Sequence, residues 1–159
     1  MGKIAIDLSE ETYQQGQATI LVVDDQETNR DLLEALLKAQ GYTTRLAASG
    51  WEALEVINNE PPDMVLLDVM MPGMDGFEVA ERLKGDEKTR ALPIIMVTGL
   101  NDRASRLRGL ESGAEDIITK PIDRRELIIR VRNLLRLKVY GDLLANYNRV
   151  LQRMFTSLN

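Results

Sequence analysis

The chain has 159 residues, a formal net charge of -5 and 44% hydrophobic residues, which suits one domain with a single sizeable core and a short appendage. It contains neither cysteine nor histidine, which excludes disulfides, thiolate nucleophiles, the usual zinc sites and serine–histidine catalytic pairs. The acidic balance gives no reason to expect a nucleic-acid surface. No apolar run is long enough for a membrane span, and residues 1–17 carry acids where a signal peptide needs an apolar core, so we expect a cytoplasmic protein.

Short apolar runs alternate along the chain with longer segments of helical period. The runs are rich in β-branched residues and predict strands at 19–23, 43–47, 64–67, 93–98 and 116–119. The segments between them repeat apolar residues at steps of three and four and predict helices at 29–41, 49–60, 75–87 and 101–113. Ser49 and Asp102 are placed to cap two helix starts, and Gly41 and Gly113 to end two helices. Together with a helical segment from residue 124 onward, this order makes five βα units.

Five βα units predict an α/β fold, a doubly wound parallel sheet with helices on both faces. The strands at 19–23, 64–67 and 93–98 are continuous apolar runs, as expected where both faces of a strand are buried. The strand at 43–47 carries Arg45 and is expected at an edge.

Polar side chains mark the points where these strands end. Asp24 and Asp25 follow the first strand, Asp68 the third and Lys120 the fifth, while Thr98 ends the fourth. Because ligands of open α/β sheets bind beyond the carboxyl ends of the strands, we expect these side chains on one rim. Three crowded carboxylates favour a hard divalent cation such as Mg²⁺. The rim therefore predicts phosphoryl chemistry: Asp68 is placed to be the nucleophile, and Thr98, Lys120 and the metal to stabilise the phosphoryl oxygens.

Four segments, "LVVDD", "LLDVMMPGMDG", "PIIMVTG" and "DIITKPID", make residues 18–136 resemble the receiver domain of bacterial two-component response regulators. The resemblance implies a flavodoxin-like, or CheY-like, five-stranded sheet in the order 2-1-3-4-5. It implies that Asp68 is the phosphoacceptor for a histidine kinase or phosphotransfer protein, and that Thr98 and Lys120 contact the phosphoryl group. The Mg²⁺ ligands that it implies are Asp24, Asp25, Asp68 and the backbone carbonyl of Met70.

The resemblance also bears on the loops and on the switch. It implies a cis peptide between Lys120 and Pro121 and a loop over the site shaped by Pro72-Gly73 and Gly76. Where the family usually has a switch aromatic, this chain has Ile117. Thr98 and Ile117 are thus the expected switch pair, in which the Ile117 side chain is smaller than the family's usual aromatic one.

The helical pattern that begins at residue 124 continues to the end of the chain. Its apolar steps of three and four predict a coiled-coil seam through Leu134, Leu137, Gly141, Leu144, Tyr147 or Asn148, Leu151, Met154 and Leu158. Such a stripe predicts a homodimer; a helix folded back on its own domain is the alternative, and Gly141 is a candidate bend or weak point.

The expected organisation is an N-terminal extension (1–17), a receiver domain (18–136) and a helical linker (137–159). The linker is similar to those that precede cyclic-di-GMP phosphodiesterase domains of the HD-GYP type or diguanylate cyclases. By that resemblance, any output enzyme would lie beyond residue 159.

Two other functions compete with a phosphorylatable switch. The first is a pseudo-receiver that binds partners without phosphorylation. The complete set of rim residues argues against this function. The second is a small phosphatase or nucleotide-binding enzyme. Haloacid-dehalogenase-type phosphatases need a second Asp where this chain has Met70, and the chain has no G-x-x-x-x-G-K-[ST] or G-x-G-x-x-G loop. We therefore expect a switch and no dedicated enzyme, with neither nucleic acid nor membrane as a partner.

Overall fold

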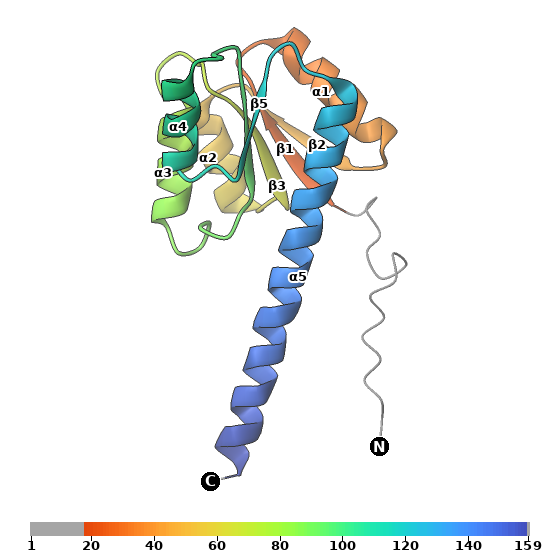
Figure 1. Ribbon diagram of the computed structural model, residues 1–159, viewed down its shortest axis with the longest axis vertical. Coiled ribbons are helices and arrows are strands. Elements are labelled where there is room, and N and C mark those ends of the chain that lie inside the picture. Colours follow the sequence, from red (N-terminus) through yellow and green to blue (C-terminus); the bar gives the residue numbers. More distant parts are fainter. Residues whose placement is uncertain (1–17, 159) are drawn as a thin grey trace.

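The computed structural model of the protein describes residues 18–158 and shows one wound α/β domain with a long projecting helix (Figure 1). The strands are β1 (Thr19–Val23), β2 (Thr43–Ala47), β3 (Met64–Asp68), β4 (Ile94–Thr98) and β5 (Asp116–Thr119). The helices are α1 (Glu27–Ala39), α2 (Gly50–Asn59), α3 (Gly76–Gly85), α4 (Arg103–Glu111) and α5 (Arg124–Ser157).

All five strands pair in parallel in the order β2-β1-β3-β4-β5, which confirms the expected fold. Strands β3 and β4 are buried along their whole length, and β1 at all but its first residue, while β2 lies at one edge and is largely half-exposed. Strand β3 runs one residue further than predicted and includes Asp68, which pairs with Val97 of β4. The carboxylate thus sits on the last paired residue of the central strand.

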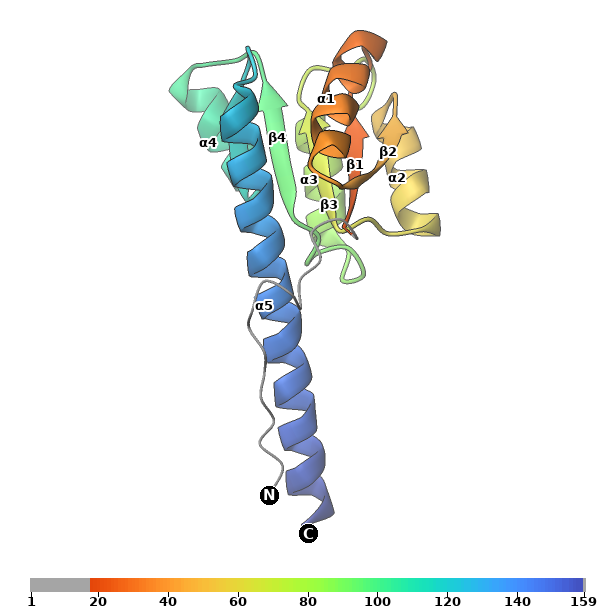
Figure 2. The same ribbon diagram turned by 90° about the vertical axis from the view of Figure 1, so that its right-hand side faces the viewer.

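Two helical layers enclose the sheet (Figure 2). Helices α1 and α5 bury Leu33, Leu37, Leu127, Val131 and Leu135 against one face of the sheet. On the other face, α2 and α3 bury an apolar cluster that includes Ile57, Phe77 and Leu83. Alternate residues of each buried strand contribute to the two clusters, because successive side chains point to opposite faces of a sheet.

The helix boundaries follow the predicted capping signals. The Ser49 hydroxyl accepts a hydrogen bond from the Glu52 N–H (3.1 Å), and an Asp102 carboxylate oxygen accepts one from the Ser105 N–H (2.7 Å). Gly41 and Gly113 have φ of 89° and 105°, left-handed values that glycine adopts without a Cβ clash. Each of these predicted caps is confirmed.

Helix α5 is one continuous helix that passes through Gly141 and extends away from the domain (Figures 1 and 2). Its first turns are anchored by three buried side chains, and residues 141–150 are exposed throughout. The folded-back alternative is therefore not the conformation of this helix. Residues 1–17, for which a separate extension is expected, lie outside the described part of the chain. Among residues 18–158, no helix has the length and hydropathy that a membrane span requires.

Candidate functional site

The carboxyl ends of the strands bring five predicted side chains to one rim of the sheet. Asp24 and Asp25 directly follow β1, Asp68 ends β3, Thr98 ends β4 and Lys120 follows β5. Oxygen atoms of the three carboxylates lie within 4.8 Å of one another. Asp24 and Asp68 are buried, whereas Asp25 is exposed. The convergence predicted from strand order is thus present, with one carboxylate facing solvent and two facing inward.

Asp24 is held from several directions. Its backbone N–H donates to the carbonyl of Ala47 on β2 (3.1 Å), and one carboxylate oxygen accepts from the Gln26 N–H (2.9 Å). The guanidinium of Arg30 donates to the Asp24 carbonyl (2.7 Å) from the first turn of α1. An arginine on a helix gives no sequence signal for this role, because a solvated position has the same pattern. Arg30 is therefore a positioning residue that only the tertiary structure identifies.

Lys120 is the cation that faces the buried carboxylates. Its Nζ lies 3.2 Å from Asp68 Oδ1 and 3.7 Å from Asp24 Oδ2. Its side chain is 29% exposed, which leaves the ammonium accessible to a group arriving from solvent. The Lys120–Pro121 peptide is cis, as the resemblance implies.

The environment of Asp68 disfavours its charge. Burial raises the pKa of Asp68 above its ordinary value of 3.8, and the neighbouring Asp24 carboxylate raises it further. The charge and hydrogen bond of Lys120 oppose both effects only in part. A second positive charge in the rim would favour the ionised form.

Thr98 is buried and its hydroxyl is oriented by the following loop. Its Oγ1 accepts a hydrogen bond from the Leu100 N–H (2.9 Å), which leaves the hydroxyl hydrogen to be donated elsewhere. The Lys120 N–H donates to the Thr98 carbonyl (2.7 Å), so the two residues are tied through the backbone as well.

The loop from Val69 to Asp75 connects the carboxylate of β3 to α3. Gly76 opens α3, and its N–H donates to the Val69 carbonyl (2.9 Å). A Cβ at Gly76 would lie 2.4 Å from the Asp68 carbonyl oxygen, so only glycine permits this approach. Met70 lies in the loop and is 64% exposed. Close packing of α3 on β3 therefore sets the course of the loop beside Asp68.

Ile117 occupies the expected switch position beneath α4. It is buried, and a Cβ at Gly109 would lie 2.6 Å from Ile117 Cδ1 and 3.3 Å from Met96 Sδ. Gly109 is the buried residue of α4, while Leu107 and Leu110 are exposed. Helix α4 thus rests on the sheet through a glycine that lies against the Ile117 side chain.

The three carboxylates and Lys120 fit a divalent cation by their chemistry. Mg²⁺ prefers oxygen ligands, and the carboxylates carry more negative charge than one ammonium balances. The same arrangement provides a buried nucleophile, a hydroxyl donor and an ammonium around one point of the rim. Such a set suits phosphoryl transfer, in which catalysis depends on positioning and on charge stabilisation.

Comparison with known proteins agrees with this geometry. The model of the response regulator receiver domain family matches residues 20–132. "Response regulator PleD" of Caulobacter vibrioides is 52% identical over 125 residues, which make up 79% of this chain and 28% of PleD. "Phosphate regulon transcriptional regulatory protein PhoB" of Pseudomonas aeruginosa is 44% identical over 124 residues, 78% of this chain and 54% of PhoB. The chain thus spans about a quarter of the one and about half of the other.

A solved structure supports the fold independently. The response regulator receiver domain protein (CheY-like) from Methanospirillum hungatei superposes with a TM-score of 0.73 at 30% sequence identity, covering 78% of this chain and 98% of that one. The family match covers well over half of the chain and includes every rim residue. The chain therefore belongs to the response regulator receiver domain family of two-component systems.

Proposed function

We propose that the chain is a phosphorylatable switch in which Asp68 accepts a phosphoryl group from a histidine kinase or phosphotransfer protein. The observation that carries this proposal is the placement of the Lys120 ammonium between two buried carboxylates, 3.2 Å from Asp68 and 3.7 Å from Asp24, at the end of the central strand. A purely structural ion pair would not need the third carboxylate of Asp25 or the adjacent hydroxyl of Thr98.

In the proposed reaction an Asp68 carboxylate oxygen attacks the phosphorus of a phosphohistidine. A P–O bond forms, the P–N bond breaks with its electron pair left on the imidazole nitrogen, and the product is an aspartyl phosphate. The residues proposed to hold Mg²⁺ are Asp24, Asp25, Asp68 and the carbonyl of Met70. Bound Mg²⁺ would neutralise carboxylate and phosphoryl oxygens during the transfer.

Lys120 and Thr98 would act on the transferred group. The Lys120 ammonium exchanges its contact with Asp68 for a phosphoryl oxygen, and the Thr98 hydroxyl donates to another. As Thr98 moves toward the phosphoryl group, the hydrogen bond that it accepts from the Leu100 N–H pulls the β4–α4 loop with it. Ile117 is the proposed second member of the switch. Because its side chain lies against Gly109 of α4, α4 shifts when Ile117 moves.

The proposed output is a homodimer formed through the projecting part of α5, whose stability or geometry responds to the phosphoryl group. This requires the two states of the dimer to differ in their affinity for that group. We assign residues 18–136 to the receiver and 137–159 to the linker, place the switch in the cytoplasm, and assign no catalytic turnover, nucleic-acid binding or membrane binding to this chain.

Phosphorylation is tested directly by incubation with Mg²⁺ and acetyl phosphate. One phosphoryl group should be added, stable in acid and labile in alkali, and it should be absent from Asp68→Asn. The matched control is Asp75→Asn, which changes the half-buried carboxylate that caps α3 after the neighbouring loop and should still be labelled, because Asn also caps a helix. Labelling that survives in Asp68→Asn would move the phosphoacceptor elsewhere.

The metal is tested separately by thermal unfolding. Mg²⁺ should raise the melting temperature of the wild type, because binding to the native state stabilises it, and Asp25→Ala should abolish the rise. A full Mg²⁺ effect in Asp25→Ala would exclude Asp25 as a ligand.

A further inference from the structure

Asp25 is the rim carboxylate that no other side chain holds in place. It is exposed, and within residues 18–158 its carboxylate has no hydrogen-bond or ion-pair partner. The two other carboxylates differ, because Asp24 accepts from the Gln26 N–H and Asp68 contacts Lys120. The direction in which Asp25 presents its carboxylate therefore depends on how its backbone is held.

Three hydrogen bonds close a ring around Asp25. The Gln26 N–H donates to Asp24 Oδ1 (2.9 Å), the Arg30 N–H donates to the Gln26 carbonyl (3.1 Å), and Arg30 Nη1 donates to the Asp24 carbonyl (2.7 Å). The ring holds one atom of each peptide group that flanks Asp25, the Asp24 carbonyl before it and the Gln26 N–H after it. Because a peptide group is planar, holding both groups restricts the two backbone dihedral angles of Asp25.

Both ends of the Arg30–Asp24 contact are anchored in the fold. The Asp24 N–H donates to the Ala47 carbonyl of β2 (3.1 Å), which ties the acceptor side to the sheet. Arg30 belongs to α1, which Leu33 and Leu37 fix in the core, so the donor side is tied to a packed helix. Without the guanidinium, the Asp24 carbonyl would lose this link between the sheet and α1.

Arg30 occupies an unfavourable position for a cation, since it lies in the first turn of α1, where the helix dipole favours negative charge. Its guanidinium donates to a main-chain carbonyl and, among the described residues, forms no ion pair with the rim carboxylates. A guanidinium paired with Asp24 or Asp25 would compete with a metal ion for the same oxygens. One that holds a carbonyl orients the carboxylates and leaves their oxygens free.

Resting on the proposed metal-dependent switch, we infer that Arg30 is a positioning residue for Mg²⁺, which presents the Asp25 carboxylate to the ion by holding the Asp24 carbonyl. Loss of a group that orients a metal ligand weakens metal binding by about 10–100-fold. The guanidinium charge acts in the opposite direction, because a cation beside the rim repels Mg²⁺. A neutral substitution at Arg30 thus weakens Mg²⁺ binding if positioning dominates and strengthens it if charge dominates.

Isothermal titration calorimetry with Mg²⁺ on the full-length, unphosphorylated protein separates the two effects. Arg30→Met, which is neutral and cannot donate, should raise the Mg²⁺ Kd about tenfold. Arg30→Lys keeps the charge and a donor but lacks the planar fork, and its Kd should lie between those of Arg30→Met and the wild type. Mg²⁺ binding by Arg30→Met that equals or exceeds the wild type would overturn the inference.

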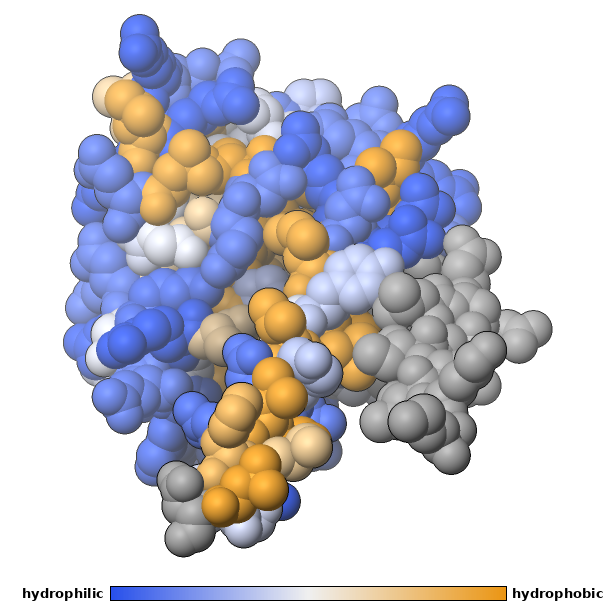
Figure 3. Space-filling view, turned by 60° about the horizontal axis from the view of Figure 1, so that its bottom comes forward, coloured by the Kyte–Doolittle hydropathy of each residue, from blue (hydrophilic) through white to orange (hydrophobic). Residues whose placement is uncertain are grey.

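Arg149→Met is the matched control, because it removes the same charge from the exposed, projecting part of α5. Figure 3 shows this part of the helix in the foreground, at the end that extends away from the domain. Arg149 lies about 37 Å along α5 from Arg124, several Debye lengths at physiological salt, so the Kd should stay within about twofold of the wild type. Far-UV circular dichroism in EDTA checks folding, and Arg30→Gln, also neutral, replaces Arg30→Met if that variant does not fold.

Phosphorylation by acetyl phosphate supplies a second readout. The Mg²⁺ concentration for half-maximal labelling of Asp68 should rise in Arg30→Met by the factor found in calorimetry, while the rate at saturating Mg²⁺ changes much less. A lower saturating rate with unchanged half-saturation would also overturn the inference. A wild type that binds Mg²⁺ without being labelled contradicts only the proposed switch, and a labelled wild type whose Arg30→Met variant binds Mg²⁺ normally contradicts only the role of Arg30.

Discussion

Asp68 combines two demands that oppose each other, since it must be buried at the end of the central strand and yet be ionised to act as a nucleophile. Burial and the Asp24 carboxylate raise its pKa, while Lys120 offsets part of the penalty. The native state without metal therefore binds a proton at Asp68 more tightly than the unfolded chain does. Stability from this residue is greatest below the unfolded pKa and is lost as the pH rises through the native pKa.

Asp68→Asn should accordingly stabilise the metal-free protein at neutral pH, because it removes a buried charge that the native state tolerates poorly. The gain over the wild type should shrink as the pH falls and Asp68 of the wild type takes up its proton. Denaturant unfolding in EDTA between neutral and acidic pH measures this. Asp31→Asn, on the exposed side of α1, is the control and should show no such pH-dependent gain. Equal or lower stability of Asp68→Asn at neutral pH would contradict the electrostatic account.

Gly76 offers a second prediction at this scale, because its Cα lies against the backbone of Asp68. Gly76→Ala should destabilise the fold by about 1–3 kcal/mol, since the added Cβ meets main-chain atoms that cannot rotate away. Gly85→Ala, at the other end of α3, meets nothing within 4 Å and should be neutral or stabilising by about 0.5–1 kcal/mol. Urea unfolding of the two variants checks the contrast, and equal effects would refute the close approach.

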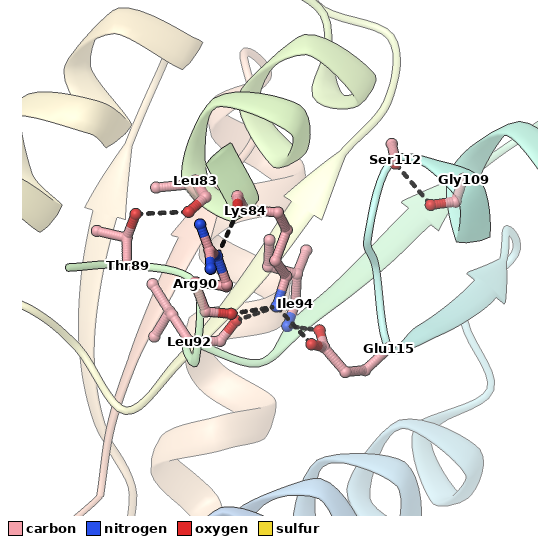
Figure 4. A network of polar contacts seen from close by, with 9 residues as sticks. All are labelled: Leu83, Lys84, Thr89, Arg90, Leu92, Ile94, Gly109, Ser112 and Glu115. Carbon is pink, nitrogen blue, oxygen red and sulfur yellow. Dashed lines mark hydrogen bonds and ion pairs between the residues drawn. The ribbon is translucent and has the colours of Figure 1, made fainter. Parts of the chain in front are cut away.

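The elements are also joined at the amino-terminal edge of the sheet, opposite the functional rim. Lys84 at the end of α3 donates to the carbonyls of Arg90 (3.1 Å) and Leu92 (2.8 Å) and pairs with Glu115, which in turn accepts from the Ile94 N–H (2.6 Å) (Figure 4). This clamp connects α3, the start of β4 and the start of β5.

Lys84→Met should lower the free energy of unfolding by about 1–3 kcal/mol, because charged hydrogen bonds are lost and the half-buried Glu115 keeps only its backbone donor. Lys88→Met, at an exposed position of the same connection, should stay within about 0.5 kcal/mol of the wild type. Denaturant titrations of both variants decide the matter. A negligible loss in Lys84→Met would mean that the clamp contributes no net stability.

For the whole molecule, the receiver and the projecting part of α5 are expected to be energetically separable. Leu135 is 1% exposed and belongs to the core, whereas Leu144 is 62% exposed and residues 141–150 are exposed throughout. Lys138 marks the transition, with an ion pair to Asp63 at 3.8 Å. The boundary between folding unit and linker, predicted at residue 136, stays a prediction that truncation can test.

Truncation tests this separation. A chain that ends at Lys138 should unfold with the wild-type midpoint at concentrations too low for association. A chain that ends at Leu134 should lose about 2–5 kcal/mol, the usual cost of removing a buried leucine side chain. Thermal and urea unfolding of the two chains provide the measurement, and a large loss on truncation at Lys138 would show that the projecting helix supports the domain.

The sequence alone determined the order of the elements, the parallel sheet and the rim on which Asp24, Asp25, Asp68, Thr98 and Lys120 meet. These follow from local patterns and from a topological rule: strands that alternate with helices must run in parallel, so their carboxyl ends share one edge. Only the tertiary structure decided that Leu134, the first residue of the predicted seam, packs partly against the core cluster of α1 and α5, because that contact joins segments far apart in the sequence. The same holds for Arg30 beside Asp24, Gly76 against Asp68 and the Lys84 clamp. Each depends on a contact between segments that pack together only in the folded chain, where neither periodicity nor composition carries a signal.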